Sequence, residues 1–178
     1  MIDDPRRKKE QQMTISILNE HDAKAYQELR LQALQTNPEA FGSTYEREAA
    51  FSLSFVQERL TPSEGKFTMG AWVDGDLVGM ATFVRETSPK MAHKGNIFGM
   101  FVSPDMHGKA VGRSLLEELL QHIKGFDGLE QINLTVVSDN EPAKRLYTSL
   151  GFTVFGVEKH GLKFDGCYYD EDWMVLRL

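Results

Sequence analysis

The sequence predicts one mixed α/β domain, an α+β sandwich in which helices cover a mostly antiparallel sheet. Segments with the alternation typical of strands are grouped in the middle and at the end of the chain. A helical pattern lies between two of them as a single β-α-β passage, and no repeat or internal linker divides the chain. A length of 178 residues fits one domain with one core.

The N-terminal third is predicted to contain a tail, a strand and two helices. Residues 1–12 are polar and basic without apolar patterning, so we expect a disordered tail. Ile15 and Ile17 alternate with polar residues and predict a strand over residues 14–18. Apolar residues at helical spacing predict one helix over residues 22–36 and a second over residues 44–60.

The middle of the chain is predicted to be strand-rich. Residues 67–73 and 77–85 flank Asp74-Gly75-Asp76, which is a strong hairpin signal because glycine supplies the positive φ of a tight turn. Residues 96–102 are almost continuously apolar, as expected for a central strand covered on both faces. This part therefore supplies three strands of the sheet.

The C-terminal half alternates helices and strands. The apolar stripe from Val111 to Ile123 predicts an amphipathic helix, and residues 131–137 predict a strand. A further helix runs from Pro142 to a capping glycine at position 151. Two last strands near residues 152–160 and 167–177 bring the prediction to six or seven strands and about four helices.

Composition narrows the class of protein. The net charge of −6 argues against nucleic acid as a partner and suits a protein that receives a cationic amine. No apolar run approaches the ~20 residues that span a bilayer, and no apolar segment follows the basic N-terminus, so we expect a cytoplasmic protein without membrane contact. Cys167 is the only cysteine, which excludes an internal disulfide and a Cys-rich metal site, and we expect no metal.

The most informative segment is MFVSPDMHGKAVGR, residues 100–113, where a buried strand runs into a glycine-bearing loop that opens a helix. The first turn of a helix has unpaired N–H groups and a partial positive charge, and glycines let a phosphate approach closely. Lys109 and Arg113 add positive charge there. The segment lacks the full P-loop and GxGxxG patterns, so it predicts a pyrophosphate site or, alternatively, a turn needed only for packing.

Two motifs resemble the GNAT acetyltransferase superfamily over most of residues 13–178, which we therefore expect to be a single N-acetyltransferase domain. Val102-Ser103-Pro104 followed by HGKAVGR, residues 107–113, resembles its V-x-P strand end and R-G-K-G-x-G loop, with His107 in place of arginine and Ala110 in place of glycine. Residues 140–152 match its second motif, N-x-x-A-x-x-[L/F]-Y-x-x-x-G-F, throughout. The N-terminal half resembles a bacterial branch without an assigned substrate.

The resemblance implies acetyl-CoA as co-substrate. The backbone of Met100 and Val102 is then expected to pair with the pantetheine arm, and the amides of residues 108–113 to hold the pyrophosphate. The implied cofactor-binding residues are Met100, Phe101, Val102, His107, Gly108, Lys109, Ala110, Val111, Gly112, Arg113, Asn140, Lys144 and Tyr147.

The resemblance also implies catalytic roles. Tyr147 is expected to be the general acid that protonates the leaving thiolate, and the backbone amide of Met100 to be the oxyanion donor. No carboxylate lies in residues 95–99, so the base stays open, with Glu86 or His93 acting through water as candidates. Residues in or just before the second predicted helix are expected either to line an amine site or to be ordinary surface and core: Phe41, Tyr45, Glu46, Glu48, Phe51 and Phe55.

The expected acceptor is a small primary amine or a peptide N-terminus, acetylated by direct attack. An acyl-CoA-binding sensor without turnover is the alternative, because His107 and the missing strand glutamate depart from the family pattern. A nucleotide-dependent transferase is less consistent with the second motif. A homodimer is compatible with exposed terminal strands, although no residue requires it.

Overall fold

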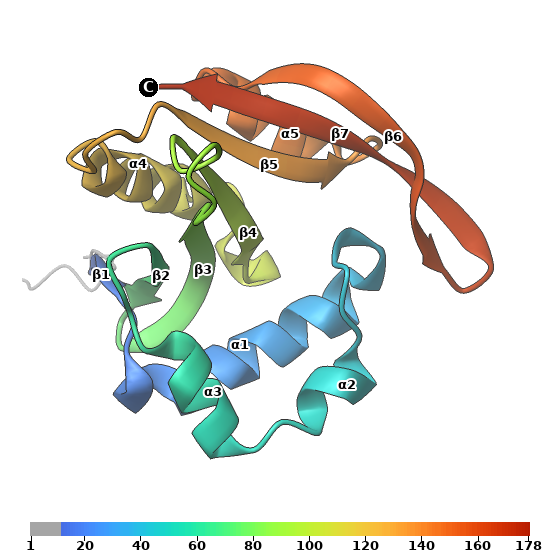
Figure 1. Cartoon of the computed structure of the whole chain (residues 1–178). Helices are drawn as coiled ribbons and strands as arrows, with labels where there is room; N and C mark the ends of the chain where they lie inside the picture. Colours follow the sequence, from blue (N-terminus) through green and yellow to red (C-terminus); the bar gives the residue numbers. More distant parts are fainter. Residues whose placement is uncertain (1–11) are drawn as a thin grey trace, which may run out of the picture.

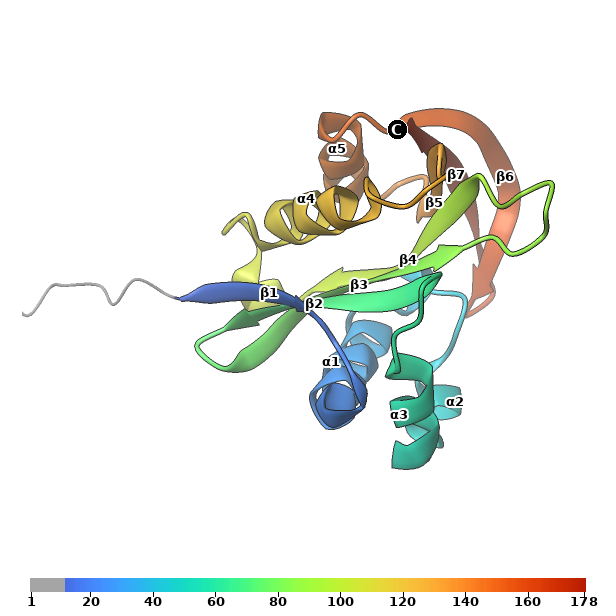
Figure 2. The same cartoon turned by 60° about the vertical axis from the view of Figure 1, so that its left-hand side comes forward.

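The computed structural model describes residues 12–178, in which one seven-stranded sheet is covered by helices on both faces (Figures 1 and 2). The strands are β1 (Met13–Ile17), β2 (Lys66–Val73), β3 (Asp76–Arg85), β4 (Lys94–Val102), β5 (Gln131–Val137), β6 (Thr153–Phe164) and β7 (Cys167–Arg177). The α-helices are α1 (Ala23–Thr36), α2 (Tyr45–Ala49), α3 (Leu53–Leu60), α4 (Val111–Ile123) and α5 (Glu141–Ser149). Three 3₁₀ turns join them: η1 (Glu20–Asp22), η2 (Pro38–Ala40) and η3 (Pro104–Met106).

The strand order is β1-β2-β3-β4-β5-β7-β6, and every neighbouring pair is antiparallel except β4–β5. The predicted mixed, mostly antiparallel sheet of six or seven strands is therefore confirmed. The disordered tail predicted for residues 1–12 lies, apart from Gln12, outside the described residues.

Two apolar cores lie on opposite faces of the sheet. Figure 2 shows α4 and α5 on one face and α1, α2 and α3 on the other. The α4 stripe predicted from helical spacing lies over β2, β3 and β4 on that first face and belongs to the same apolar core as Ile132, Leu134 and Val136 of β5. The second core joins α1 and α3 to Met80 and Phe101. Because side chains alternate along a strand, the other four β5 positions, Gln131, Asn133, Thr135 and Val137, lie on the opposite face, that of the α1–α3 layer.

The single helix predicted over residues 44–60 is wrong, because two helices occupy this segment. α2 ends at Ala49, and the Ser52 hydroxyl accepts a hydrogen bond from the Phe55 amide at 3.2 Å to begin α3. Serine competes for backbone hydrogen bonds and so favours the start of a helix over its interior. On either side of the break, α2 and α3 each contact α1.

The sheet opens between β4 and β5. The two strands pair only over Lys94–Asn96 and Gln131–Asn133, and beyond this short ladder they diverge. A bulge bends β4 just after the ladder, since Gly99 and Met100 together oppose Ala81 of β3 and Gly99 has a φ of +60°. The unpaired backbone of β4 is thereby presented to the opening.

The last two strands form a hairpin longer than predicted. β6 continues to Phe164 instead of ending near residue 160, and its pairing with β7 has two register shifts, between Val154 and Gly156 and between Glu158 and Leu162. Figure 1 shows the hairpin curving beyond the end of β5, and β6 contacts η2. The hairpin thus closes one side of the opening in the sheet.

Candidate functional site

A cleft of about 1230 Å³ occupies the opening between β4 and β5. On one face of the sheet its lining includes the start of α4 and the inner side of α5, and on the other it includes side chains of α1, α2 and α3. The strand segments Ile97–Val102 and Leu134–Val137 form the passage between these two ends. The cleft therefore runs through the sheet and reaches both helical layers.

The N-terminus of α4 forms one end of the cleft. The first backbone hydrogen bond of this helix runs from the Ser114 amide to the Ala110 carbonyl at 2.9 Å. The amides before Ser114 therefore have no partner within the helix. Gly108 and Ala110 have φ values of +76° and +60°, and this left-handed backbone turns the loop so that the helix starts at the cleft. The helix dipole adds positive potential, so this end is suited to an anionic group such as a phosphate.

The close packing of this loop explains its second glycine. A Cβ on Gly112 would lie 3.3 Å from the Met100 Cε and 3.4 Å from a methyl group of Leu146. Glycine at this position therefore lets the helix start approach β4 and α5 closely, whereas a larger residue would require Met100 and Leu146 to shift.

Of the three polar side chains predicted to bind the cofactor at this end, two form contacts within the protein and one is exposed outside the cleft. The ring nitrogen Nε2 of His107 lies 2.9 Å from the Val102 carbonyl oxygen, to which it donates, so the ring braces the loop against β4. Arg113 donates to Glu117 at 2.9 Å and to the Ser149 hydroxyl at 2.7 Å, which ties α4 to α5. Lys109 is exposed and does not line the cleft.

The two predicted polar residues around α5 also have structural partners. The Asn140 side-chain oxygen accepts from the Ala143 amide at 3.2 Å and caps α5 at the edge of the cleft. Lys144 lies outside the cleft lining, where its Nζ forms an ion pair with Asp172 at 2.8 Å and donates to the Ser138 carbonyl. The structure thus brings Asn140 to the cleft and uses Lys144 to hold α5 on β7.

Tyr147 lies on the inner side of α5 and lines the cleft with Met100 and Val102. It is 7% exposed, and its ring packs edge-on against Phe152. Burial raises the pKa of Tyr147 to about 12. The hydroxyl is therefore protonated at neutral pH and able to donate a proton or a hydrogen bond into the cleft.

The two base candidates taken from the sequence lie away from this lining. Glu86 follows the end of β3 and accepts a hydrogen bond from the Asn96 side chain at 2.8 Å. His93 precedes β4, where its carbonyl accepts from the Glu130 amide. Neither residue lines the cleft, although both lie near the short β4–β5 ladder.

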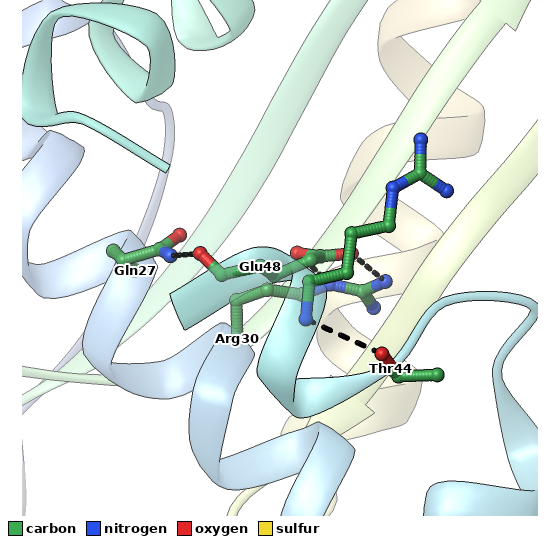
Figure 3. A network of polar contacts seen from close by, with 5 residues as sticks. Gln27, Arg30, Thr44 and Glu48 are labelled. Atoms are coloured by element: carbon green, nitrogen blue, oxygen red, sulfur yellow. Dashed lines mark hydrogen bonds and ion pairs between the residues drawn. The ribbon is translucent and has the colours of Figure 1, made fainter. Parts of the chain in front are cut away.

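The far end of the cleft contains a buried ion pair between α1 and α2. The carboxylate of Glu48 receives hydrogen bonds from Arg30 Nε at 3.0 Å and Nη2 at 2.8 Å. Figure 3 shows the two side chains side by side, with Gln27 donating to the Glu48 carbonyl oxygen at 2.7 Å. Burial alone would raise the pKa of Glu48, but the hydrogen bond and charge of Arg30 outweigh it and the pKa is lowered below 4.5.

Aromatic side chains surround this ion pair. Three of the predicted residues, Phe41, Phe51 and Phe55, line the cleft, whereas Tyr45 and Glu46 do not. The guanidinium carbon of Arg30 lies 4.9 Å from the centre of the Phe41 ring. This end of the cleft therefore combines apolar walls with a fixed positive group.

Sequence reasoning overlooked Arg30, although a signal was present. In α1 the buried positions after Ala23 are Tyr26, Leu29, Arg30, Ala33 and Leu34, which follow the i, i+3, i+4, i+7, i+8 spacing of a core-facing stripe. A charged residue inside such a stripe must have a buried partner, which points to a functional or structural ion pair.

Glu171 is a second residue that the sequence did not indicate. It lies on β7 opposite Val137, faces the α1–α3 layer and lines the cleft. Burial raises the pKa of its carboxyl above 4.5, and the nearby charge of Glu158 adds to this, against a hydrogen bond from Thr135. The alternation of residues 167–177 predicts on which face of the strand Glu171 lies. That it lies at the opening of the sheet follows only from the pairing of β7 with β5.

Two absences concern the described residues alone. No cluster of three or more His, Cys, Asp or Glu side chains suited to a metal ion occurs within residues 12–178. Nor does that part of the chain contain a helix with the length and apolar character required to cross a bilayer.

Comparisons with known proteins agree with this geometry. A family model described as the acetyltransferase (GNAT) family matches residues 25–152. The L-amino acid N-acetyltransferase AaaT of Escherichia coli K12 is 31% identical over 119 residues, which are 67% of this chain and 73% of the relative. The N-alpha-acetyltransferase RimI of Mycobacterium tuberculosis is 34% identical over 99 residues, 55% of this chain and 59% of that protein.

Solved structures share the fold along almost the whole chain. A GNAT-family acetyltransferase from Streptococcus pneumoniae superposes with a TM-score of 0.83 at 21% identity and covers 94% of this chain and 100% of its own. The yncA protein of Salmonella typhimurium, a putative acetyltransferase solved with its cofactor acetyl-CoA, gives a TM-score of 0.75 at 23% identity, with 93% and 94% covered.

Proposed function

The chain belongs to the GNAT family of acetyltransferases, and from that premise we propose that it transfers an acetyl group from acetyl-CoA to a primary amine by direct attack. The observation that carries this proposal is the cleft through the sheet. It leads from the free amides of α4 past the unpaired edge of β4 to the far end around Arg30 and Glu48, which we call the acceptor chamber. Such a passage suits a long cofactor entering from one face and an acceptor entering from the other.

The residues of the first face fit the phosphate and pantetheine parts of acetyl-CoA. The amides that precede Ser114 are oriented by the left-handed loop and lie in the field of the α4 dipole, which favours a pyrophosphate. Beyond the bulge, the Met100 backbone and the Val102 amide have no strand partner on the β5 side and are available to an extended chain, while the Val102 carbonyl oxygen already accepts from His107. The thioester would supply the activated acetyl group, and the Met100 amide is our candidate donor to its oxygen.

Tyr147 is the proposed general acid. Burial keeps its hydroxyl protonated, with a pKa of about 12, and its position between α5 and β4 faces the passage. A donor there would protonate the departing thiolate during the attack.

Glu171 replaces Glu86 as our preferred base. An alkylammonium group with a pKa near 10 is only ~0.1% neutral at pH 7, so the acceptor needs a group that takes its proton. Glu171 lies inside the cleft on the acceptor face, and burial raises the pKa of this carboxyl, which makes it a better proton acceptor than an ordinary glutamate. Glu86, which lies outside the lining, has no such access.

The test is to assay a panel of amines with acetyl-CoA and to measure turnover by the release of the CoA thiol. We expect Tyr147→Phe to lower kcat about 100-fold or more with little change in the KM for acetyl-CoA, while Tyr168→Phe, an exposed residue outside the cleft, has no effect. With wild-type protein, kcat/KM should rise with pH as Glu171 ionises, at a pH above its ordinary 4.5, and Glu171→Gln should lose this rise.

Two outcomes would contradict the proposal. Binding of CoA without turnover of any amine would favour the acyl-CoA-binding sensor, which the substitution of His107 in the loop keeps open. Full activity of Tyr147→Phe would exclude the tyrosine as the acid while leaving the acetyl transfer itself in place.

A further inference from the structure

One guanidinium in the acceptor chamber has a donor without a partner. Arg30 is 8% exposed, and its Nε and Nη2 are both occupied by Glu48. Its third nitrogen, Nη1, has no hydrogen-bond partner, and among the side chains of residues 12–178 it is the only buried nitrogen or oxygen of which this is true. A buried charged donor without a partner is unfavourable, so this nitrogen calls for an acceptor atom that the chain itself does not supply.

The spare nitrogen lies beside the bulge of β4. A Cβ placed on Gly99 would be 3.8 Å from Arg30 Nη1, and Met100, the candidate oxyanion donor, follows Gly99 directly. An anionic group held by Arg30 would therefore lie next to the place where the amine must attack.

The charges around Arg30 favour an anion over a polycation. Arg47 and Arg59 also line this end of the cleft, and neither forms an ion pair with any carboxylate of residues 12–178. Two carboxylates line this part of the cleft, Glu48, which is paired with Arg30, and Glu171 on β7. Three arginines against two carboxylates leave the chamber with a local excess of positive charge although the chain carries a net charge of −6, and this disfavours a polyamine.

We propose that the acceptor is an α-amino acid, whose carboxylate binds Arg30 and Arg47 while its amino group faces the bulge of β4. This inference rests on the acetyl transfer proposed above and specifies its substrate class. In an α-amino acid a single carbon separates the amino group from the carboxylate, so the anion site must adjoin the point of attack, and Arg30 beside Gly99 meets that requirement. Phe41 and the half-exposed Phe98 offer apolar walls for the side chain.

The experiment compares amino acids with the amines that lack only the carboxylate. Leucine is paired with 3-methylbutylamine, phenylalanine with 2-phenylethylamine, and each amino acid also with its uncharged amide. We expect kcat/KM to be at least about tenfold higher for each amino acid than for either analogue, the loss associated with one charge-assisted hydrogen bond. Equal or better turnover of the decarboxylated amines, of spermidine or of a peptide N-terminus would overturn the proposal.

Variants connect the preference to the two arginines. Arg47→Gln is expected to raise the KM for amino acids about tenfold, to leave the KM for uncharged amines unchanged and to be rescued in part by Arg47→Lys. Lys24→Gln removes a charge from the exposed side of α1, outside the cleft, and should change neither KM. Arg30→Lys keeps a charge for Glu48 but removes the spare nitrogen, so it should raise the same KM, with its melting curve recorded to confirm folding.

The anion site can be tested even if the protein acetylates no amine. If no amine is acetylated, calorimetry with N-acetylleucine and with the uncharged N-acetyl-3-methylbutylamine still tests the anion site. Tighter binding of the carboxylate, lost in Arg47→Gln, supports the site. Equal binding of the two compounds, or binding of neither, overturns it.

Discussion

Ala110 has a backbone conformation that alanine rarely adopts. Its φ of +60° lies in the left-handed region, where the Cβ of an L-residue crowds the carbonyl that follows it. The common form of this loop in the family has glycine there, so the chain keeps the backbone path that aims the α4 amides and tolerates the strain. The loop geometry, and not the residue type, is what presents the α4 amides at this end of the cleft.

We therefore predict that Ala110→Gly stabilises the protein. Relief of the left-handed strain, partly offset by the greater freedom of glycine in the unfolded chain, should add about 1 kcal/mol to the free energy of unfolding. Denaturant unfolding at neutral pH measures the change. Ala25→Gly, within α1, is the matched control and should destabilise by a similar ~1 kcal/mol. A loss of stability in Ala110→Gly would show that the alanine methyl group makes contacts worth more than the strain.

At the scale of elements, α2 depends on a partner. It has only five residues, too few to be stable alone, and Arg30 and Gln27 of α1 fix it through Glu48. Removing the negative charge should leave Arg30 buried and unpaired, so Glu48→Gln is expected to lower the free energy of unfolding by about 3 kcal/mol. For a chain of this length that corresponds to a melting temperature lower by roughly 6–12 °C.

The same ion pair should make stability sensitive to acid. The pKa of Glu48 is lowered in the folded protein, so its stabilising contribution is present above pH 4.5 and is lost as the pH falls through the folded value. The difference in melting temperature between wild type and Glu48→Gln should therefore shrink on acidification. Glu46→Gln, on the exposed side of the same helix, serves as control and should show no difference at any pH.

The positions of most helices and strands could be predicted from local patterns, whereas the break between α2 and α3 and the separation of β4 from β5 could not. The α4 stripe, the hairpin at Gly75 and the capping glycine at position 151 are local signals, and each is found where it was expected. The break before Ser52 was missed because the apolar pattern runs on through it. The separation of β4 from β5 depends on a ladder of three residue pairs and a bulge at Gly99, which only the paired strands reveal.

At the scale of the whole molecule, charge is distributed unevenly. The net charge of −6 favoured a cationic acceptor, yet Arg30, Arg47 and Arg59 come from two helices and the end of a third to make one end of the cleft positive. Residues far apart in sequence meet there, so total composition cannot predict the local potential. The α4 end of the cleft, in contrast, is formed largely by one continuous segment, so local patterns could propose most of its lining, although Lys109 and Lys144 lie outside it.

The chain forms two halves that are joined weakly in the sheet. β1 to β4 and β5 to β7 are each extensively paired, but between the halves the ladder covers only Lys94–Asn96 and Gln131–Asn133. A ligand that fills the cleft beyond this ladder touches both halves at once. Bound acetyl-CoA should therefore contact both halves and hold them together.

We predict that acetyl-CoA stabilises the protein and protects both edges of the opening. At 100 times its Kd the ligand should add about 2.7 kcal/mol to the free energy of unfolding. Hydrogen exchange should slow at Met100 and Val102 and at the amides that precede Ser114, with residues 134–137 protected as the halves close, while β1 and β2 are unchanged. ATP, which shares phosphates with CoA but lacks the pantetheine arm, is the control and should protect at most the α4 amides. Protection confined to α4 with acetyl-CoA as well would mean that only the phosphates are recognised, and the opening in the sheet would then have no part in binding the cofactor.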